Sequence, residues 1–227
     1  ETFGFQYKEN EVYRSFCRSL NIDAAEVPQN KQIPFLPISL FKTHKITSTV
    51  FNPEAVFESS GTSQTVQSKH FVKSLELYAN SFLSGFVNTY GNPENWCFLG
   101  LLPSYLEKGN SSLVYMVKTL MDESQHPNNG FYLHNYTQLF DALKLLEING
   151  QQTMLFGVTY ALLDFAEQYH YQLYNTTILE TGGMKGRREK ITREEIHAKL
   201  KNRFGVKTIH SEYGMTELLS QEYSTGD

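Results

Sequence analysis

The sequence has few cysteines, no long hydrophobic run and no excess of charge of one sign. Its two cysteines, Cys17 and Cys97, lie far apart and without CxxC or Cys/His spacing, which excludes a disulfide framework and a structural zinc site. The longest apolar runs, such as 96–102, fall far short of the ~18 residues that span a membrane. Lys and Arg number 20 against 24 Asp and Glu, a net charge of -4, which argues against a general nucleic-acid or membrane-surface binder. We expect a soluble, cytoplasmic protein with no nucleic-acid partner and no membrane partner.

The start of the sequence has no charged segment followed by an apolar core, so we find no secretion signal. The sequence begins at Glu1 rather than Met and closes on Asp227, and we expect a fragment of a longer protein. With 227 residues, 40% hydrophobic and 14% aromatic, it is long enough to bury roughly 70% of its unfolded surface, which excludes intrinsic disorder as the default.

Two kinds of apolar pattern alternate along most of the chain. Short apolar or β-branched runs bounded by turn residues predict strands, and apolar residues spaced by three and four predict helices. Strands alternating with helices of ten or more residues imply βαβ units, a mostly parallel layered sheet and an α/β fold. The expected strands are 96–102, 131–134, 153–158, 176–180 and 207–211. The expected helices are 9–20, 69–88, 112–121, 138–148, 160–169 and one between the capping box at Thr192 and Gly205.

The first fifty residues differ from the rest, because prolines separate short apolar pieces around the one expected helix at 9–20. The sequence contains no internal repeat, no low-complexity tract and no linker rich in Gly, Ser or Pro. We therefore expect residues 1–55 to be an N-terminal wrapping segment of the same domain as the α/β part at 56–227.

Three loops have the composition of a phosphate or nucleotide site. Ligands of open α/β sheets bind at the carboxyl ends of strands, where backbone N–H groups are available. Small hydroxyl residues around a glycine at 58–65 could surround a phosphate, although the Walker pattern is absent. Paired glycines at 180–188 let a planar ligand approach the main chain, and at 210–217 a hydroxyl precedes an acid that can hold Mg²⁺. Taken singly, these segments are also compatible with an ordinary turn, a basic loop and a helix N-terminus.

Taken together, the three loops resemble the adenylate-forming superfamily, in which such loops occur in this order. The most specific match is Tyr213-Gly214-Met215-Thr216-Glu217. The segments 34–44, 59–70 and 180–187 are similar to the acyl-protein synthetase (LuxE) family, and the resemblance covers nearly the whole chain. It implies the large N-terminal domain of these enzymes, incomplete at its C-terminus because the mobile C-terminal part is missing.

The resemblance also implies a reaction and a set of site residues. ATP activates a fatty or aryl carboxylic acid to an acyl-adenylate with release of pyrophosphate, and the acyl group passes to a protein thiol. The catalytic residues would be Thr216, at the α-phosphate, and Glu217, which would also bind Mg²⁺. The implied contacts are Ser60, Gly61, Thr62 and Ser63 to the β- and γ-phosphates, Gly182, Gly183 and Met184 to adenine and the acyl pocket, and Glu212, Tyr213 and Gly214 to the nucleotide. A reductase is an implied partner.

The sequence departs from the family pattern in places that bear on the reaction. Gln64 and Gln67 stand where the superfamily has Gly and often Lys, and the ribose-binding Asp and C-terminal catalytic Lys are absent. Neither cysteine matches the family's acyl-accepting Cys. Two alternatives therefore stay open, a coenzyme A ligase of the phenylacetate type and a truncated, non-catalytic module that binds nucleotide or acyl groups.

Overall fold

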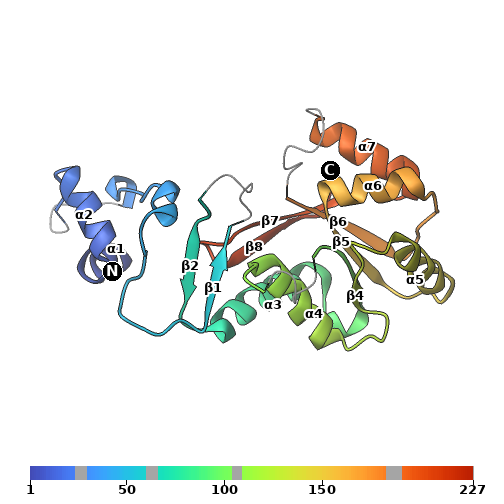
Figure 1. The fold of residues 1–227 in the computed structure, drawn as a ribbon, viewed down its shortest axis with the longest axis horizontal. Coiled ribbons are helices and arrows are strands. Elements are labelled where there is room, and N and C mark those ends of the chain that lie inside the picture. The colour runs from blue at the N-terminus through green and yellow to red at the C-terminus, as the bar shows by residue number, and fades with distance from the viewer. Residues whose placement is uncertain (24–29, 60–65, 104–108, 183–190, 227) are drawn as a thin grey trace. The chain divides into compact units, whose positions relative to one another are not determined.

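The computed structural model describes residues 1–23, 30–59, 66–103, 109–182 and 191–226 (Figure 1). The chain divides into two compact units, Glu1–Glu76 and Leu77–Asp227. Our expected subdivision at residue 55 stays a prediction.

The N-terminal unit contains short helices and a β-hairpin. Asn10 is extended, so it ends the first helix, and its side-chain oxygen accepts the Tyr13 N–H at 3.0 Å to cap the second. The helix expected at 9–20 is therefore α2, and a second helix that was not expected, α1, precedes it. The elements are α1 (Thr2–Glu9), α2 (Glu11–Ser19), the 3₁₀ turns η2 (Asn30–Gln32) and η3 (Ile38–Lys42), and the antiparallel strands β1 (Ala55–Glu58) and β2 (Lys69–Val72).

The expected helix at 69–88 begins later than its apolar spacing suggests. Residues 69–72 form β2, and α3 spans Leu75–Tyr90. The Glu54 carboxylate accepts the Leu75 N–H at 2.7 Å, which satisfies one of the unpaired donors of the first helical turn. Val72 matches the helical spacing by chance, since it is buried in the hairpin.

The C-terminal unit is built on one six-stranded sheet with the order β4-β3-β5-β6-β7-β8. All neighbouring strands are parallel except β7 and β8, which are antiparallel. The strands are β3 (Cys97–Leu101), β4 (Gly130–Phe131), β5 (Thr153–Val158), β6 (Thr176–Thr181), β7 (His210–Met215) and β8 (Ser220–Ser224); the helices are η4 (Pro93–Asn95), α4 (Ser112–Ser124), α5 (Tyr136–Ile148), α6 (Thr159–Gln168) and α7 (Arg193–Phe204). The predicted α/β fold with a mostly parallel layered sheet is confirmed.

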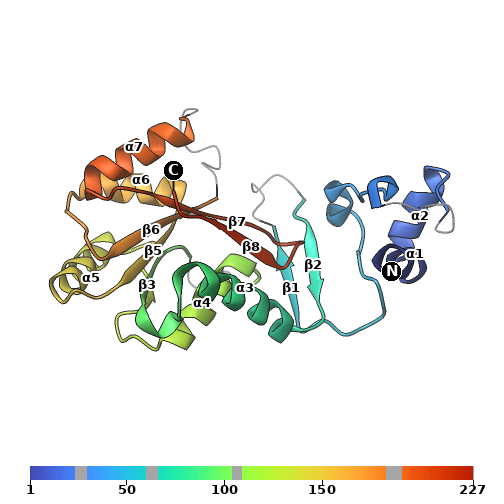
Figure 2. The same cartoon turned by 180° about the vertical axis from the view of Figure 1, so that it is seen from behind.

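Helices cover both faces of this sheet. Figures 1 and 2 show α3 and α4 on one face and α6 and α7 on the other. Tyr78 of α3 stacks on Tyr115 of α4 with ring centroids 5.9 Å apart, and Phe165 of α6 stacks on Phe204 of α7 at 5.6 Å. Every residue of β3 and of β5 is buried, which explains why their sequences are continuous apolar runs rather than alternating ones.

The end of the sheet differs from the expectation. The strand predicted at 207–211 is β7 at 210–215, and a second strand, β8, follows after a turn over 216–219. Leu219 occupies the left-handed region in this turn, with φ of 51°. An antiparallel edge strand with one exposed face has polar residues at alternate positions, so β8 has no continuous apolar run.

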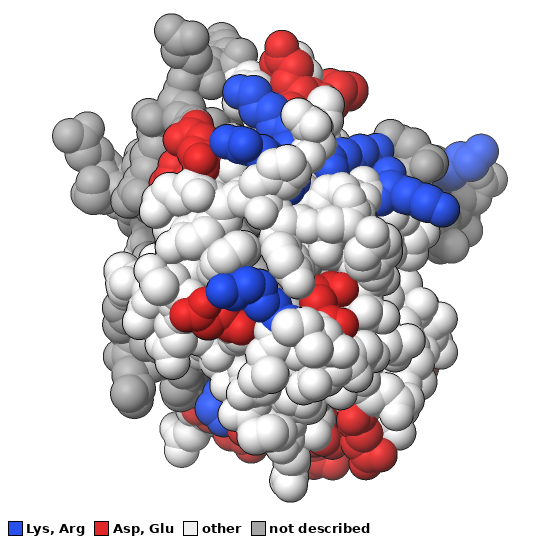
Figure 3. Space-filling view, turned by 90° about the vertical axis from the view of Figure 1, so that its right-hand side faces the viewer, with Lys and Arg blue, Asp and Glu red and all other residues white. Residues whose placement is uncertain are grey.

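The surface shown in Figure 3 carries acidic and basic side chains interspersed, with lysines and arginines most crowded in its upper part. Over the described residues, no helix combines the length and apolar character needed to cross a membrane.

The aromatic side chain of Phe86 connects α3 to the sheet, and we predict that its loss strongly destabilises the C-terminal unit. Phe86 is fully buried and its ring centroid lies 5.5 Å from Phe98 and 6.4 Å from Tyr223. Phe86→Ala should lower the free energy of unfolding by about 3–5 kcal/mol. A loss of 1 kcal/mol lowers the melting temperature of a chain of this size by about 2–4 °C, so the melting temperature measured by circular dichroism should fall by roughly ten degrees. Val87→Ala, at an exposed position of the same helix, is the control and should change it little. Equal effects of the two substitutions would contradict this packing.

Candidate nucleotide site

The parallel register brings the carboxyl ends of three neighbouring strands to one edge of the sheet. Val158 at the end of β5 lies beside Thr181 at the end of β6, and Thr181 lies beside Glu212 of β7. The second expected loop therefore begins beside the third expected segment, 210–217, which is not a loop, because its residues 210–215 form β7. This edge is where open α/β sheets bind ligands.

Gly182 begins the glycine-rich loop directly after β6. Its φ of +76° is one that residues with a side chain rarely adopt, which explains the glycine at this position. The Thr159 hydroxyl, at the start of α6, lies 2.6 Å from the Gly182 carbonyl oxygen and also contacts the Glu180 carboxyl group. One side chain of α6 thus fixes the carbonyl of Gly182, the residue that follows β6.

Glu212 lies among polar groups rather than in open solvent. The Thr181 hydroxyl donates to Glu212 Oε2 at 2.5 Å. Burial raises the pKa of the Glu212 carboxyl group, the Thr181 hydrogen bond lowers it, and the nearby charge of Glu180 raises it further. Burial also raises the pKa of the Glu180 carboxyl group. Two carboxyl groups that both resist ionisation therefore lie on the adjacent strands β6 and β7.

Gly214 lies close to the ends of two flexible side chains, which would have to shift to make room for a larger residue. A Cβ at this position would lie 2.6 Å from Glu212 Oε1 and 3.3 Å from Gln221 Nε2. Tyr213, the residue before it, is 62% exposed, since alternate residues of a strand point to opposite faces. The segment therefore offers an accessible aromatic ring beside an uncovered stretch of main chain.

Thr216 and Glu217 lie in the turn that joins β7 to β8. The Ser112 hydroxyl oxygen, in the first turn of α4, is 3.4 Å from the Thr216 hydroxyl oxygen. The N-terminus of a helix and a pair of hydroxyls favour an anion. Glu217 is half-buried in the same turn.

Two consecutive hydrogen bonds connect β8 to the N-terminus of α4 through Tyr78 of α3. Gln221 Nε2 donates to the Tyr78 hydroxyl at 2.8 Å, and that hydroxyl donates to the Ser112 carbonyl oxygen at 3.2 Å. Side chains of β8 and α3 thus hold the main chain at the N-terminus of α4, which lies beside Thr216. Sequence reasoning missed Ser112 and Thr159, although both open helices that follow strands of the sheet, which is the one signal that could have identified them.

The structure describes only part of the expected site. Gly182, Glu212, Tyr213, Gly214, Thr216 and Glu217 lie on two neighbouring strands or directly after them. The remaining six expected residues, Ser60, Gly61, Thr62, Ser63, Gly183 and Met184, lie outside the described residues.

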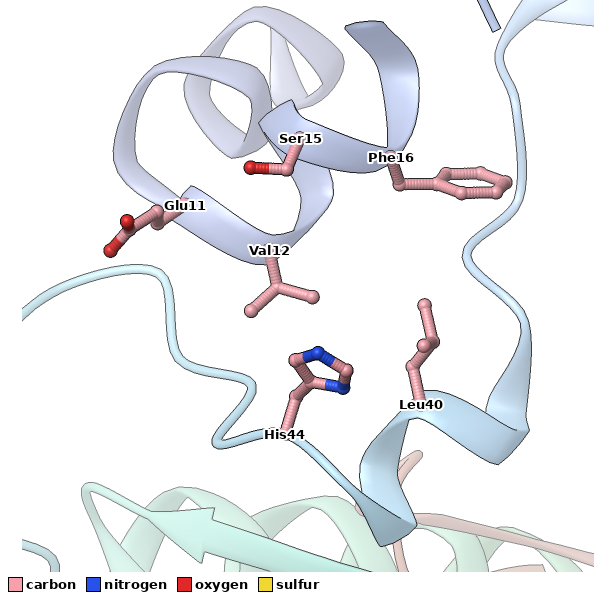
Figure 4. A pocket seen from close by; sticks show the side chains of 6 residues that line it. All are labelled: Glu11, Val12, Ser15, Phe16, Leu40 and His44. Atoms are coloured by element: carbon pink, nitrogen blue, oxygen red, sulfur yellow. The ribbon is translucent and has the colours of Figure 1, made fainter. Parts of the chain in front are cut away.

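A separate pocket of about 380 Å³ lies on the N-terminal unit. Figure 4 shows Val12 of α2 pointing toward Leu40 and His44. Glu11, Ser15 and Phe16 also line it, and the lining includes none of the expected site residues that the structure describes.

Comparison with known families supports the resemblance found in the sequence. Residues 1–80 match the sequence model of a family described as acyl-protein synthetase, LuxE. The predicted resemblance to this family is thus confirmed over these residues. No curated protein matches the chain.

The raised pKa of Glu212 leads to a prediction about stability. A carboxyl group whose pKa is higher in the folded than in the unfolded chain stabilises the fold fully below about pH 4.5, and this contribution is lost as pH rises through the folded pKa. Glu212→Gln keeps the acceptor for Thr181 but has no proton to lose. Its melting temperature relative to the wild type should therefore increase by a few degrees between pH 5 and pH 8.

The measurement is a series of thermal melts without nucleotide. Glu222→Gln on β8 is the matched control, because this carboxyl group is exposed on the neighbouring strand. A melting difference for Glu212→Gln that is independent of pH would show that the carboxyl group ionises equally in the folded and unfolded chain.

Proposed function

We propose that this chain carries the ATP-dependent acyl-adenylating site of an acyl-protein synthetase. The substrate is a carboxylic acid with a fatty or aryl body, the first product is an acyl-adenylate with pyrophosphate, and the acyl group then passes to a thiol. The observation that carries the proposal is the pairing of Thr181 with Glu212, which sets the start of the glycine-rich segment, at Gly182, beside the segment Tyr213-Gly214-Met215-Thr216-Glu217. The family match over residues 1–80 supports it independently.

The described residues suit the parts of a nucleotide. The exposed ring of Tyr213 offers a face on which adenine can stack, and Gly182 leaves the neighbouring main chain open to a planar ligand. Thr216, beside Ser112 at the N-terminus of α4, can donate to the α-phosphate. The hydroxyl-rich loop at 60–63 is assigned to the β- and γ-phosphates from its sequence alone.

The donor set is compatible with Mg²⁺ bound together with ATP. Mg²⁺ commonly takes one or two carboxylates, several waters and substrate phosphates rather than a complete protein cage. Glu217 is assigned as the carboxylate ligand from its place in the segment Tyr213-Gly214-Met215-Thr216-Glu217. The ion would supply positive charge at the phosphates.

The first step needs no general base, because the acid is already ionised at neutral pH. A carboxylate oxygen forms a bond to the α-phosphorus as the bond to the bridging oxygen breaks, and pyrophosphate leaves. Negative charge develops on the α-phosphate oxygens, where the Thr216 hydroxyl and the helix N-terminus can stabilise it. A thiolate then attacks the acyl carbon, forms a thioester and displaces AMP.

We propose that neither Cys17 nor Cys97 is the thiol that accepts the acyl group. Both cysteines are fully buried, and burial raises the pKa of each thiol, that of Cys97 to about 12. A buried, protonated thiol is a poor nucleophile. The family match favours a protein thiol as the acceptor, with a reductase as the partner that consumes the acyl group, and coenzyme A is the alternative acceptor.

Glu217→Gln tests the metal assignment. The substitution removes a charge and keeps the size, so we expect Mg²⁺-dependent ATP affinity to fall by at least about tenfold, equivalent to about 1.4 kcal/mol. The melting temperature should stay within a few degrees of the wild type, since the residue lies in a turn. Titration calorimetry with and without Mg²⁺ measures the affinity. Glu123→Gln on the exposed surface of α4 is the control and should bind like the wild type.

Acid-dependent exchange between ATP and pyrophosphate measures the proposed chemistry directly. A panel of fatty and aryl acids defines the substrate, and transfer of labelled acyl groups to coenzyme A or to a protein thiol distinguishes the two acceptors. Coincident ATP-binding curves for the wild type and Glu217→Gln would remove this residue from the metal site. ATP binding without exchange for any acid would favour a non-catalytic binding module.

A further inference from the structure

Thr159, Glu180 and Gly182 form a buried hydrogen-bonded group at the start of the glycine loop. Thr159 is 1% exposed and Glu180 is 9% exposed. The Thr159 hydroxyl oxygen contacts Glu180 Oε1 and lies 2.6 Å from the Gly182 carbonyl oxygen. The group joins the N-terminus of α6 to the last residues of β6 and the residue that follows them.

The number of hydrogens in this group fixes its arrangement. A threonine hydroxyl has one hydrogen, and a peptide carbonyl can only accept. If Glu180 were ionised, both neighbours of the hydroxyl would be acceptors competing for that hydrogen, and one contact would be repulsive. If Glu180 is protonated, its O–H donates to Thr159 Oγ1 and the threonine hydrogen goes to the Gly182 carbonyl oxygen. Only the neutral acid satisfies both contacts.

We propose that Glu180 is a positioning residue that acts as a neutral acid, donating through Thr159 to hold the Gly182 carbonyl, the point at which the glycine-rich segment leaves β6. This inference rests on the proposed function, in which that loop borders the nucleotide. Glu180 does not touch the reacting atoms. It orients the main chain at Gly182, whose φ of +76° is rarely adopted by residues with a side chain.

The surroundings of Glu180 act in both directions. Burial raises the pKa of its carboxyl group, whereas the Thr159 hydrogen bond and the charge of Arg193 at the start of α7 lower it. Glu212 on β7 adds a second acid, since the charge of Glu180 raises the pKa of Glu212. Burial has the largest effect, which agrees with the arrangement that hydrogen counting requires.

The arrangement has a consequence for pH. When Glu180 loses its proton, the Thr159 hydrogen turns to the carboxylate and the Gly182 carbonyl loses its donor. The loop then loses one of its supports, so ATP affinity should fall as pH rises through the pKa of Glu180 and stay low above it. Below that pKa the support is intact.

Two pairs of variants test this role. Glu180→Gln keeps a neutral donor at the same place, so its ATP affinity should stay within about twofold of the wild type and should not fall where Glu180 ionises in the wild type. Glu180→Leu removes the donor and should weaken ATP binding about tenfold or more at every pH. Thr159→Val should weaken it similarly, and Thr159→Ser, which keeps the hydroxyl, should restore it.

The protonation state can be measured without ATP. In protein labelled with ¹³C at glutamate side-chain carboxyls, the signal absent from Glu180→Gln belongs to Glu180, and its titration midpoint should lie above the range of ordinary glutamates. The Gly182 amide signal should shift at the same midpoint in the wild type and not in Glu180→Gln. An ordinary midpoint, or a Glu180→Gln variant as weak as Glu180→Leu, would overturn the proposal. If the wild type does not bind ATP, the proposed function fails, and the carboxyl and amide titrations still decide the role of Glu180.

Discussion

The parallel pairing of β3, β5, β6 and β7 is the constraint on which the rest of the C-terminal unit depends. Strands buried on both faces must satisfy their backbone N–H and C=O groups within the sheet, because water is excluded from them. Consecutive parallel strands must be joined by a crossover connection, which here is a helix. These helices, α4 to α7, cover the faces of the sheet, and the carboxyl ends of the parallel strands all lie at the same edge. The candidate site follows from this arrangement, since Gly182 and Glu212 come from segments far apart in the sequence.

Much of this fold can be predicted from the sequence, because apolar runs and capping residues act on the segments in which they occur. Continuous apolar runs predict β3 and β5, and the capping box at Thr192 predicts the start of α7, where both of its hydrogen bonds are present. Where the sequence misleads, a contact between distant residues decides. Lys69–Val72 forms a strand because β1 pairs with it, and β8 exists because the turn after β7 lets the chain return along the exposed edge.

The same distinction separates the expected from the missed site residues. Glu212, Tyr213 and Thr216 belong to a contiguous motif, so a short stretch of sequence is enough to suggest them. Ser112 and Thr159 meet this motif or the start of the glycine-rich segment only through tertiary structure, and each is an ordinary residue in its own segment. The hydrogen bonds of Thr159, for example, connect it to residues more than twenty positions away along the chain. Their importance depends on strand order and register.

The two buried acids at the sheet edge show how geometry can assign opposite roles to the same residue type. Glu212 accepts a hydrogen bond from Thr181, which suits its charged form, whereas Glu180 contacts a hydroxyl whose only hydrogen is needed by a carbonyl. Because side chains alternate along β6, Glu180 and Thr181 point to opposite faces of the sheet: Glu180 toward Thr159 of α6, and Thr181 toward Glu212 of β7. Because each ionised acid disfavours the other, keeping Glu180 neutral also makes it easier for Glu212 to carry its charge. A nucleotide bound at this edge would then lie near the Glu212 carboxylate, which accepts the Thr181 hydrogen bond, and near Gly182, whose carbonyl is held through Thr159 by the uncharged Glu180.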